Sequence, residues 1–193
     1  MGIDIGQVIE AAKTKPFGFM PFFPGPGLGG HCIPIDPFYL SWKAREFGQD
    51  TRFIELAGEI NTSMPQYVIE VCLRALDDQS KSVKDSKILI LGLAYKPNVD
   101  DDRESPTYVL IEKFEALGAD VSYNDPHIPK IPQTREHPHL AGRSSSELSE
   151  QYDLILIATD HDEYRAHDFS NFGCPIVDTR TCLRKQPKKY YKS

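Results

Sequence analysis

The chain has 193 residues, of which 40% are hydrophobic and 26% are charged, and its formal net charge is −6. This length accommodates one full domain with an appendage, and the composition is typical of a globular cytoplasmic protein with a sizeable core. The dispersed basic residues argue against generic nucleic-acid binding, and the short apolar runs and the non-basic N-terminus argue against a membrane span or a signal peptide.

The beginning of the chain combines one short helix with a long irregular loop. Ile3–Lys13 is predicted as an amphipathic helix because its apolar residues recur on one face. Lys15–Pro37 contains six prolines and five glycines, so it is predicted to be irregular. A loop of this length in a compact protein is usually functional. A second helix is predicted from about Phe38 to Phe47, ending at Gly48.

Thr51–Leu76 is predicted to be a dimerisation element. Apolar residues continue at helical spacing on both sides of Pro65, which predicts either a helical pair or one kinked helix. The apolar face is too long for one small domain to cover, so we expect a homodimer through this segment. The polar stretch Gln79–Ser86 then predicts a boundary between a helical dimerisation segment, residues 1–82, and a second domain, residues 83–193.

After this boundary the pattern changes to strands that alternate with helical segments. Such alternation indicates an α/β fold with a doubly wound parallel sheet, in which ligands lie at the carboxyl ends of the strands. Pro126–Ser146 is predicted to be irregular, and the basic tail Lys185–Lys192 is predicted to be frayed. The expected strands are Lys87–Leu93, Asp120–Tyr123, Asp153–Ala158 and Pro175–Val177, with a helix at Thr107–Leu117.

The segment Gly27–Asp36 carries a thiol and a carboxylate on a glycine-dense loop. Its glycines allow the backbone to approach a ligand closely, because no Cβ intervenes. Cys32 offers a nucleophile when it is a thiolate, although a free cysteine can also be a small buried hydrophobic residue. Asp36 can orient water or stabilise a cation. It can equally cap the helix predicted to begin near Phe38, with Pro37 in the first turn.

A second motif, Gly92–Asn98, leaves the end of the first predicted strand and leads through an acidic turn into a helix. Lys96 offers three hydrogen-bond donors, and the N-terminus of the following helix attracts anions. Together they suit a diphosphate. The alternative is an ordinary solvated turn in which Arg103 pairs with Asp101 or Glu104.

A third motif, Val177-Asp178-Thr179-Arg180, ends the last predicted strand. From the residues alone, a structural salt bridge between Asp178 and Arg180 is as good an explanation of this pair as a ligand contact.

No metal site is predicted. The cysteines have no C-x-x-C spacing, which argues against a zinc ribbon and for reduced thiols. The loop histidines have no acidic or cysteine partner at recognisable ligand spacing. Asp100–Asp102 is predicted to be a solvated turn, since no EF-hand loop surrounds it. The residues considered are Cys32, Cys72, Cys174 and Cys182, and His127, His137, His139 and His161.

The three motifs together resemble one enzyme family. Phe23–Leu40 is similar to the active-site loop of the UDP-glucose/GDP-mannose dehydrogenases, which are nucleotide-sugar 6-dehydrogenases. The segment from Ala11–Phe19 onward most resembles the branch that acts on UDP-N-acetylhexosamines. Gly92–Asn98 resembles the UDP-binding turn of the family, and Val177–Arg180 resembles its terminal Asp-x-Arg.

The resemblance implies an NAD-dependent UDP-sugar 6-dehydrogenase of polysaccharide biosynthesis, with UDP-glucose as the alternative substrate. Cys32 would capture the C6 aldehyde as a thiohemiacetal, the second oxidation would give a thioester, and Asp36 would position the water that releases the acid. The implied cofactor contacts are Arg103 and Ile33. The implied substrate contacts are Phe23, Pro24, Gly25, Gly27, Gly29, Tyr95, Lys96 and Arg180.

Two features depart from the family pattern. The chain has no strand followed by G-x-G-x-x-G, so it is interpreted as a central and C-terminal portion whose main NAD site lies on another domain, and we expect it to be inactive alone. Lys13, Lys15 and Pro16 stand where many members carry an arginine, and lysine lacks the bidentate fork of arginine. The rival interpretation is a stand-alone nucleotide-sugar binding or dimerisation module without chemistry.

Overall fold

The computed structural model describes residues 3–183 and 185–193 of the chain. Its centre is a five-stranded sheet with the order β2-β1-β3-β4-β5, and every neighbouring pair of strands is parallel. The predicted α/β class with a parallel sheet is therefore confirmed. The strands are β1 (Lys87–Leu91), β2 (Asp120–Asn124), β3 (Leu154–Ile157), β4 (Ile176–Asp178) and β5 (Tyr190–Lys192).

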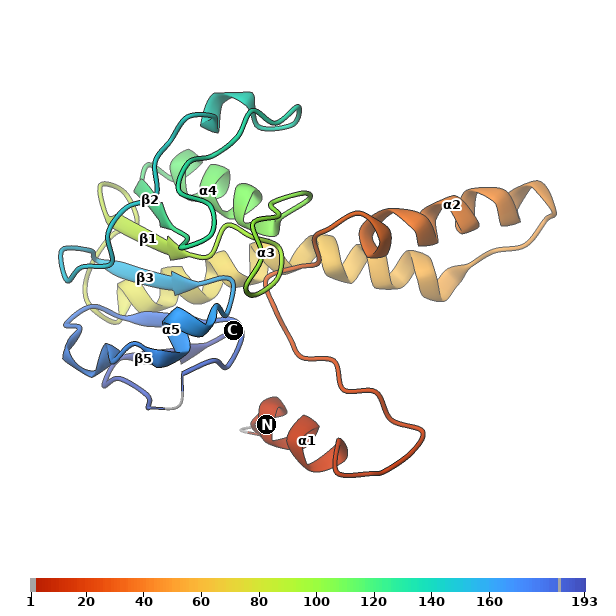
Figure 1. Cartoon of the computed structure of the whole chain (residues 1–193), viewed down its shortest axis with the longest axis horizontal. Helices are drawn as coiled ribbons and strands as arrows, with labels where there is room; N and C mark the ends of the chain where they lie inside the picture. Colours follow the sequence, from red (N-terminus) through yellow and green to blue (C-terminus); the bar gives the residue numbers. More distant parts are fainter. Residues whose placement is uncertain (1–2, 184) are drawn as a thin grey trace.

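Helices lie on both faces of this sheet (Figure 1). The helices α3 and α4 pack against one face, and α5 with a short 3-10 turn at Phe169–Asn171 packs against the other. A second 3-10 turn, Pro138–Leu140, lies in the irregular stretch after β2. The helices are α1 (Ile5–Ala12), α2 (Cys32–Glu46), α3 (Arg52–Asp77), α4 (Pro106–Ala116) and α5 (Asp162–Ala166).

Side chains from alternate strand positions form two separate cores. Successive strand residues point to opposite faces, so a strand that is covered on both faces is apolar at every position. β1 and β3 have this pattern. Ile88, Ile90, Leu154 and Leu156 belong to the core under α3 and α4. Leu89, Leu91, Ile155 and Ile157 belong to the core on the other face.

The helix α3 runs without interruption through Pro65, where a helical pair or a kinked helix was predicted. A proline inside a helix removes one backbone hydrogen bond. The second half of α3 offsets this cost, because Val68–Leu76 is packed into the core of the sheet domain. The first half projects away from the sheet beside α2 (Figure 1). Phe53 on this half is 90% exposed. α3 therefore belongs to both predicted domains, and the boundary near residue 82 stays a prediction.

The prediction of an irregular chain up to Pro37 is wrong for its last six residues, because α2 already begins at Cys32. Pro34 lies in the first turn, where the backbone N–H groups have no partner within the helix and a proline is tolerated. Asp36 consequently lies inside the helix and is not its N-cap, which corrects the capping interpretation. His31 occupies the N-cap position without a side-chain hydrogen bond.

The predicted frayed tail is also wrong, because its end forms β5 at the edge of the sheet. Tyrosine side chains anchor this strand. The Tyr190 hydroxyl donates to the Asp178 carboxylate at 2.9 Å, and the Tyr191 hydroxyl donates to Asp78 at the end of α3, also at 2.9 Å. Lys192 forms an ion pair with Asp4, which caps α1. The tail therefore joins the sheet to the N-terminal helix.

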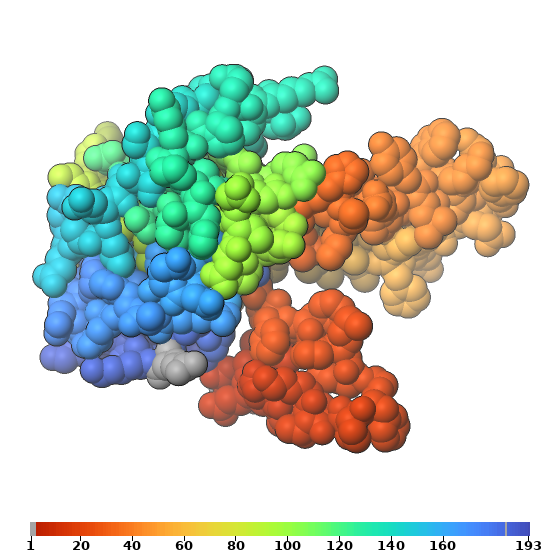
Figure 2. All heavy atoms as spheres, viewed as in Figure 1, coloured from red at the N-terminus to blue at the C-terminus, as the bar shows by residue number. Residues whose placement is uncertain are grey.

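The helix α1 lies beside this edge of the sheet domain, and a long extended segment leads from it to α2 (Figures 1 and 2). Gly6 of α1 faces Thr181, which follows β4. No helix among the described residues combines the length and the apolar character needed to cross a membrane.

Candidate functional site

The three sequence motifs meet at the carboxyl edge of the sheet. The second motif directly follows β1, and the third ends β4, so the parallel arrangement brings both to the same edge. The extended segment that leads to α2 crosses this edge and contacts both. Gly25 lies against the guanidinium group of Arg180, and Gly29 lies against Tyr95. The tertiary structure thus assembles residues from distant parts of the sequence into one site.

Glycines at positions 29 and 30 permit the closest of these contacts. A Cβ at Gly29 would lie 2.5 Å from the Tyr95 Cβ and 2.8 Å from the Glu104 carbonyl oxygen. Gly30 has a φ of +81° and donates its N–H to the Arg103 carbonyl oxygen at 2.8 Å. A larger residue would displace this loop, because a Cβ cannot approach other heavy atoms below 3.0 Å. The loop before Cys32 is therefore fixed directly on the second motif.

Two further contacts hold the same loop. The Leu28 N–H donates to the Asn61 side-chain oxygen on α3 at 2.8 Å. Gly27 lies against Pro106, the first residue of α4. The glycine loop is thus placed between the projecting helices and the sheet domain.

Cys32 is exposed and is the first residue of α2. Asp36 follows one helical turn later and is also exposed, so both side chains lie on the same face of the helix. Ile33 beside them is 61% exposed. The arrangement places a thiol, a carboxylate and the uncapped first turn of a helix at one accessible position.

Arg103 is close to Cys32 and forms an ion pair with Asp101 at 2.6 Å. Of the two partners left open by the sequence, Asp101 is therefore the one used. The hydrogen bond with Asp101 raises the pKa of Arg103 above its ordinary value. A cavity of about 310 Å³ lies beside this group, and its lining includes His31, Arg103, Tyr108, Arg135 and His137.

Arg180 is not paired with Asp178, so the salt-bridge interpretation of the third motif is wrong for these two side chains. The Asp178 carboxylate instead accepts hydrogen bonds from the backbone N–H of Arg180 and from two following residues. The Arg180 Nε donates to the Ala158 carbonyl oxygen at 2.8 Å. Burial lowers the pKa of Arg180 below its ordinary value. The rest of the guanidinium group borders an open cavity.

That cavity has a volume of about 880 Å³ and lies between α1, the extended segment and the end of β4. Its lining brings together three predicted substrate contacts, Phe23, Pro24 and Arg180. Lys96 is not among the lining residues. It is exposed at the tip of the second motif, and its Nζ lies 5.2 Å from the centre of the Tyr95 ring. Lys96 therefore lies beside Tyr95, which contacts Gly29 and Gly30 just before Cys32. It does not line the cavity around Arg180.

Sequence reasoning missed two buried polar residues at the same edge. Asp125 directly follows β2 and His161 precedes α5, and their exposed fractions are 2% and 0%. The signal was present only in part. The polar run 159–162 closely follows the apolar strand β3, whereas Asp125 follows β2, which is itself largely polar. The sequence indicated no structural role for either residue, and His161 was considered only as a metal ligand.

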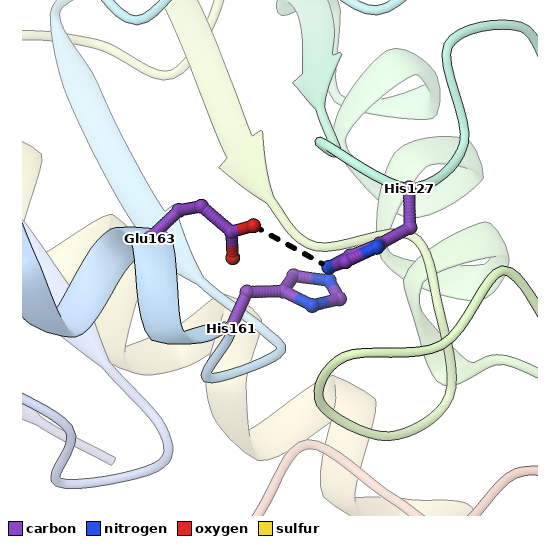
Figure 3. Close-up of side chains that lie close together, drawn as sticks. All are labelled: His127, His161 and Glu163. Carbon is purple, nitrogen blue, oxygen red and sulfur yellow. Dashed lines mark ion pairs between the residues drawn. The ribbon is translucent and has the colours of Figure 1, made fainter.

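His161 also forms a cluster with His127 and Glu163 (Figure 3). Its three possible ligand atoms lie within 4.8 Å of one another. His161 has no free lone pair, however. Its Nδ1 accepts the Asn98 N–H at 2.9 Å, so its proton is on Nε2, which points to Asp125 at 3.1 Å. The hydrogen bonds of this histidine therefore argue against a metal ion at the cluster.

Comparisons with known proteins agree with the geometry. Residues 89–185 match the UDP binding domain of the UDP-glucose/GDP-mannose dehydrogenase family, and residues 1–63 match its central domain. A UDP-N-acetyl-D-mannosamine dehydrogenase of Methanococcus maripaludis is 36% identical over 95% of this chain, and a UDP-N-acetyl-D-glucosamine 6-dehydrogenase of Salmonella typhi is 31% identical over 90%. The chain spans 42% and 40% of the lengths of these relatives.

A solved structure with the same fold is that of the UDP-D-ManNAc dehydrogenase from Pyrococcus horikoshii. Its TM-score to this chain is 0.83 at 29% sequence identity. The match covers 99% of this chain and 44% of that protein.

Proposed function

The chain belongs to the UDP-glucose/GDP-mannose dehydrogenase family, and we propose that it forms the central and UDP-binding part of an NAD-dependent UDP-sugar 6-dehydrogenase. The observation that carries this proposal is the contact between the glycine loop and the second motif. Gly29 and Gly30 pack on Tyr95, and this contact brings the exposed thiol of Cys32 next to the turn that holds Lys96. A thiol beside an anion-binding turn suits a nucleotide sugar whose far end is oxidised.

Cys32 is proposed as the nucleophile. Its Sγ attacks the carbonyl carbon of the C6 aldehyde and gives a thiohemiacetal, and the second oxidation converts this adduct to a thioester. Water then cleaves the thioester to the carboxylate and restores the thiol. Its exposed position at the start of α2 supports this role, because the free N–H groups of the first turn can stabilise negative charge on the substrate oxygen.

Asp36 is proposed to orient the water that attacks the thioester. It lies on the same face of α2 as Cys32, and its exposed carboxylate can accept a hydrogen bond from that water. The corrected start of α2 strengthens this role, since Asp36 is not needed as a helix cap.

Substrate binding is proposed at two places, the turn that carries Lys96 and the cavity beside Arg180. Lys96 would donate to the diphosphate, beside Tyr95. Arg180, with Phe23 and Pro24 in the 880 Å³ cavity, would hold another part of the nucleotide sugar. Gly25, Gly27 and Gly29 would contribute through the close approach of their backbone.

NAD, when bound, would accept the hydrides of both oxidations. The residues present fit a contact to this cofactor, because Arg103 and Ile33 are both near Cys32 and both are exposed. They would hold it from one side only, and the glycine-rich turn that binds a dinucleotide would come from another domain. Arg103 stays oriented by its ion pair with Asp101.

The proposed substrate is a UDP-N-acetylhexosamine. The printed names of the two relatives, one for a mannosamine and one for a glucosamine derivative, support this class. UDP-glucose is the alternative. Four free thiols support the cytoplasm as the compartment.

We also propose a homodimer, but through a shorter surface than the sequence predicted. Val68–Leu76 is covered by the sheet domain, so only the projecting half of α3 remains available. Together with α2 it projects from the sheet domain (Figure 2) and exposes large apolar side chains. Two grooves there are lined by side chains that include Phe38, Trp42, Phe53 and Ile54. A second copy would cover this surface, and sedimentation at micromolar concentration checks the assembly.

Calorimetry with UDP on the 193-residue chain tests the nucleotide site. The wild type should bind UDP, and Lys96→Ala should weaken binding by ~1.5–3 kcal/mol, the range for a hydrogen bond to a charged group. The control is Lys188→Ala in the tail. Equal affinities of the wild type and Lys96→Ala would contradict the site. UDP binding without turnover of any UDP-sugar would fit the need for a further domain. Robust turnover by this chain alone would contradict it.

A further inference from the structure

Asp125 and His161 form a buried polar pair that the proposed chemistry does not use. Asp125 leaves the end of β2 and His161 leaves the end of β3, on either side of the strand that carries the second motif. Both side chains are completely buried. A buried carboxylate is costly unless it is fully hydrogen-bonded. The question is what its hydrogen bonds hold.

Two of them hold the beginning of the second motif, Gly92–Asn98, which is called the Lys96 loop below. Oδ2 of Asp125 accepts the backbone N–H groups of Leu93 at 2.7 Å and Ala94 at 2.9 Å. The same oxygen faces Nε2 of His161 at 3.1 Å. Oδ1 accepts the N–H groups of His127 and Ile128 and so ties the carboxylate to its own loop. One carboxylate therefore joins the ends of three neighbouring strands.

His161 holds the far side of the same loop. Its Nδ1 accepts the Asn98 N–H at 2.9 Å. Asn98 has a φ of +61°, a backbone conformation that residues other than glycine seldom adopt but that Asn tolerates better than most. The Asn98 side chain also donates to Asp162 at 2.9 Å and accepts the Asp162 N–H at 3.1 Å. The turn after Lys96 is thus fixed by residues that precede or begin α5.

The remaining contacts complete the support. The Thr159 hydroxyl donates to the Ala94 carbonyl oxygen at 2.6 Å, and the Tyr95 N–H donates to the Asp101 carbonyl oxygen at 3.0 Å. Lys96 is left exposed at the tip of a loop whose backbone is bound before and after it. A flexible lysine gains affinity from a fixed backbone, because less freedom is lost when the ligand binds.

We propose that Asp125 and His161 are positioning residues for the nucleotide sugar, which hold the loop so that Lys96 is presented to the diphosphate. This inference rests on the proposed role of Lys96. It gives a role in substrate binding to two residues that do not themselves touch the substrate.

Two substitutions of His161 separate its two contacts. An Asn side chain can place its oxygen where Nδ1 accepts the Asn98 N–H, whereas a Gln side chain reaches the position of Nε2 and leaves this N–H unpaired. We expect His161→Gln to weaken UDP binding to the 193-residue chain by about 5-fold, and His161→Asn to keep most of the wild-type affinity. His139→Gln, at an exposed histidine outside the loop, is the matched control.

A double substitution distinguishes positioning from general stability. In a Lys96→Ala background, His161→Gln should cause no further loss of UDP affinity, while it lowers the melting temperature as much as it does alone. If His161→Gln does not fold, Thr159→Val provides the test, because it removes the hydroxyl that donates to Ala94 and should weaken UDP binding. Thr159→Ser keeps a hydroxyl and should keep the wild-type affinity.

The outcomes are distinct. Absence of UDP binding by the wild-type chain would overturn the proposed nucleotide site together with this inference. UDP binding by the wild type with equal affinities of the Gln and Asn variants would overturn the positioning role alone. The positioning role would also be overturned if His161→Gln weakened UDP binding in the Lys96→Ala background by as much as it does alone.

Discussion

Two loops form the proposed site, and they are held by opposite means. The loop with Lys96 is fixed by hydrogen bonds between its backbone and the side chains of Asp125, Thr159 and His161. The loop before Cys32 depends largely on close packing, because Gly29 and Gly30 have no side chain and allow the backbone to lie directly on Tyr95. The first is sensitive to the loss of a hydrogen bond and the second to the gain of a methyl group.

The difference matches what each loop would do. The Lys96 loop would bind a charged group that stays unchanged in the reaction, and a rigid backbone serves this purpose. The glycine loop ends at Cys32, whose Sγ would form and break a bond, and it lies between the sheet domain and the projecting helices. Substitutions in the two loops should therefore separate binding from chemistry.

The largest expected effect is that of Cys32→Ser in an enzyme that joins these residues to a dinucleotide-binding domain. Serine keeps the size of the side chain, but its hydroxyl is hardly ionised near neutral pH. Formation of the uronic acid should fall by about 10³-fold or more, while UDP-sugar affinity is retained. Product analysis and calorimetry measure the two quantities. Cys174→Ser, at a partly buried thiol, is the control. Normal acid production by Cys32→Ser would exclude the covalent mechanism.

A smaller effect is expected from Gly29→Ala, which tests the glycine loop directly. The added Cβ would overlap Tyr95 and the Glu104 carbonyl group, so the loop must move. We expect the free energy of unfolding to fall by about 1–3 kcal/mol, as for other overpacked sites, and UDP affinity to fall with it. Urea denaturation provides the measurement.

Gly173→Ala is the matched control for this substitution, because a Cβ at Gly173 would meet nothing within 4 Å. Equal stabilities of the two variants would show that close packing does not fix the glycine loop, and the contrast between the loops would be lost.

The smallest effect concerns the pH dependence of the Lys96 loop. Burial alone would raise the pKa of Asp125, but hydrogen bonds from His161 and the backbone lower it below its ordinary value. The ionised carboxylate therefore stabilises the fold above its unfolded pKa near 4, and this contribution is lost as the pH falls further. The stability difference between the wild type and Asp125→Asn should be greater at pH 7 than at pH 3. A constant difference would contradict the role of the charge.

The sequence by itself determined most of the local elements and the family. Continuous apolar runs predicted the buried strands β1 and β3, and their alternation with helices predicted the parallel sheet. The three motifs, through their resemblance to one family, predicted Cys32, Lys96 and Arg180 as site residues, and the roles of these residues stay predictions. These features depend on neighbouring residues only, so they could be read without coordinates.

The tertiary structure alone decided how those elements end and meet. Pro65 would break an isolated helix, but α3 continues because its second half is packed into the sheet domain. The tail becomes β5 because Tyr190 and Tyr191 reach residues far away in the sequence. The same is true of the contact between Gly29 and Tyr95 and of the Asp125–His161 pair. Each depends on long-range packing, whose free energy no local pattern contains.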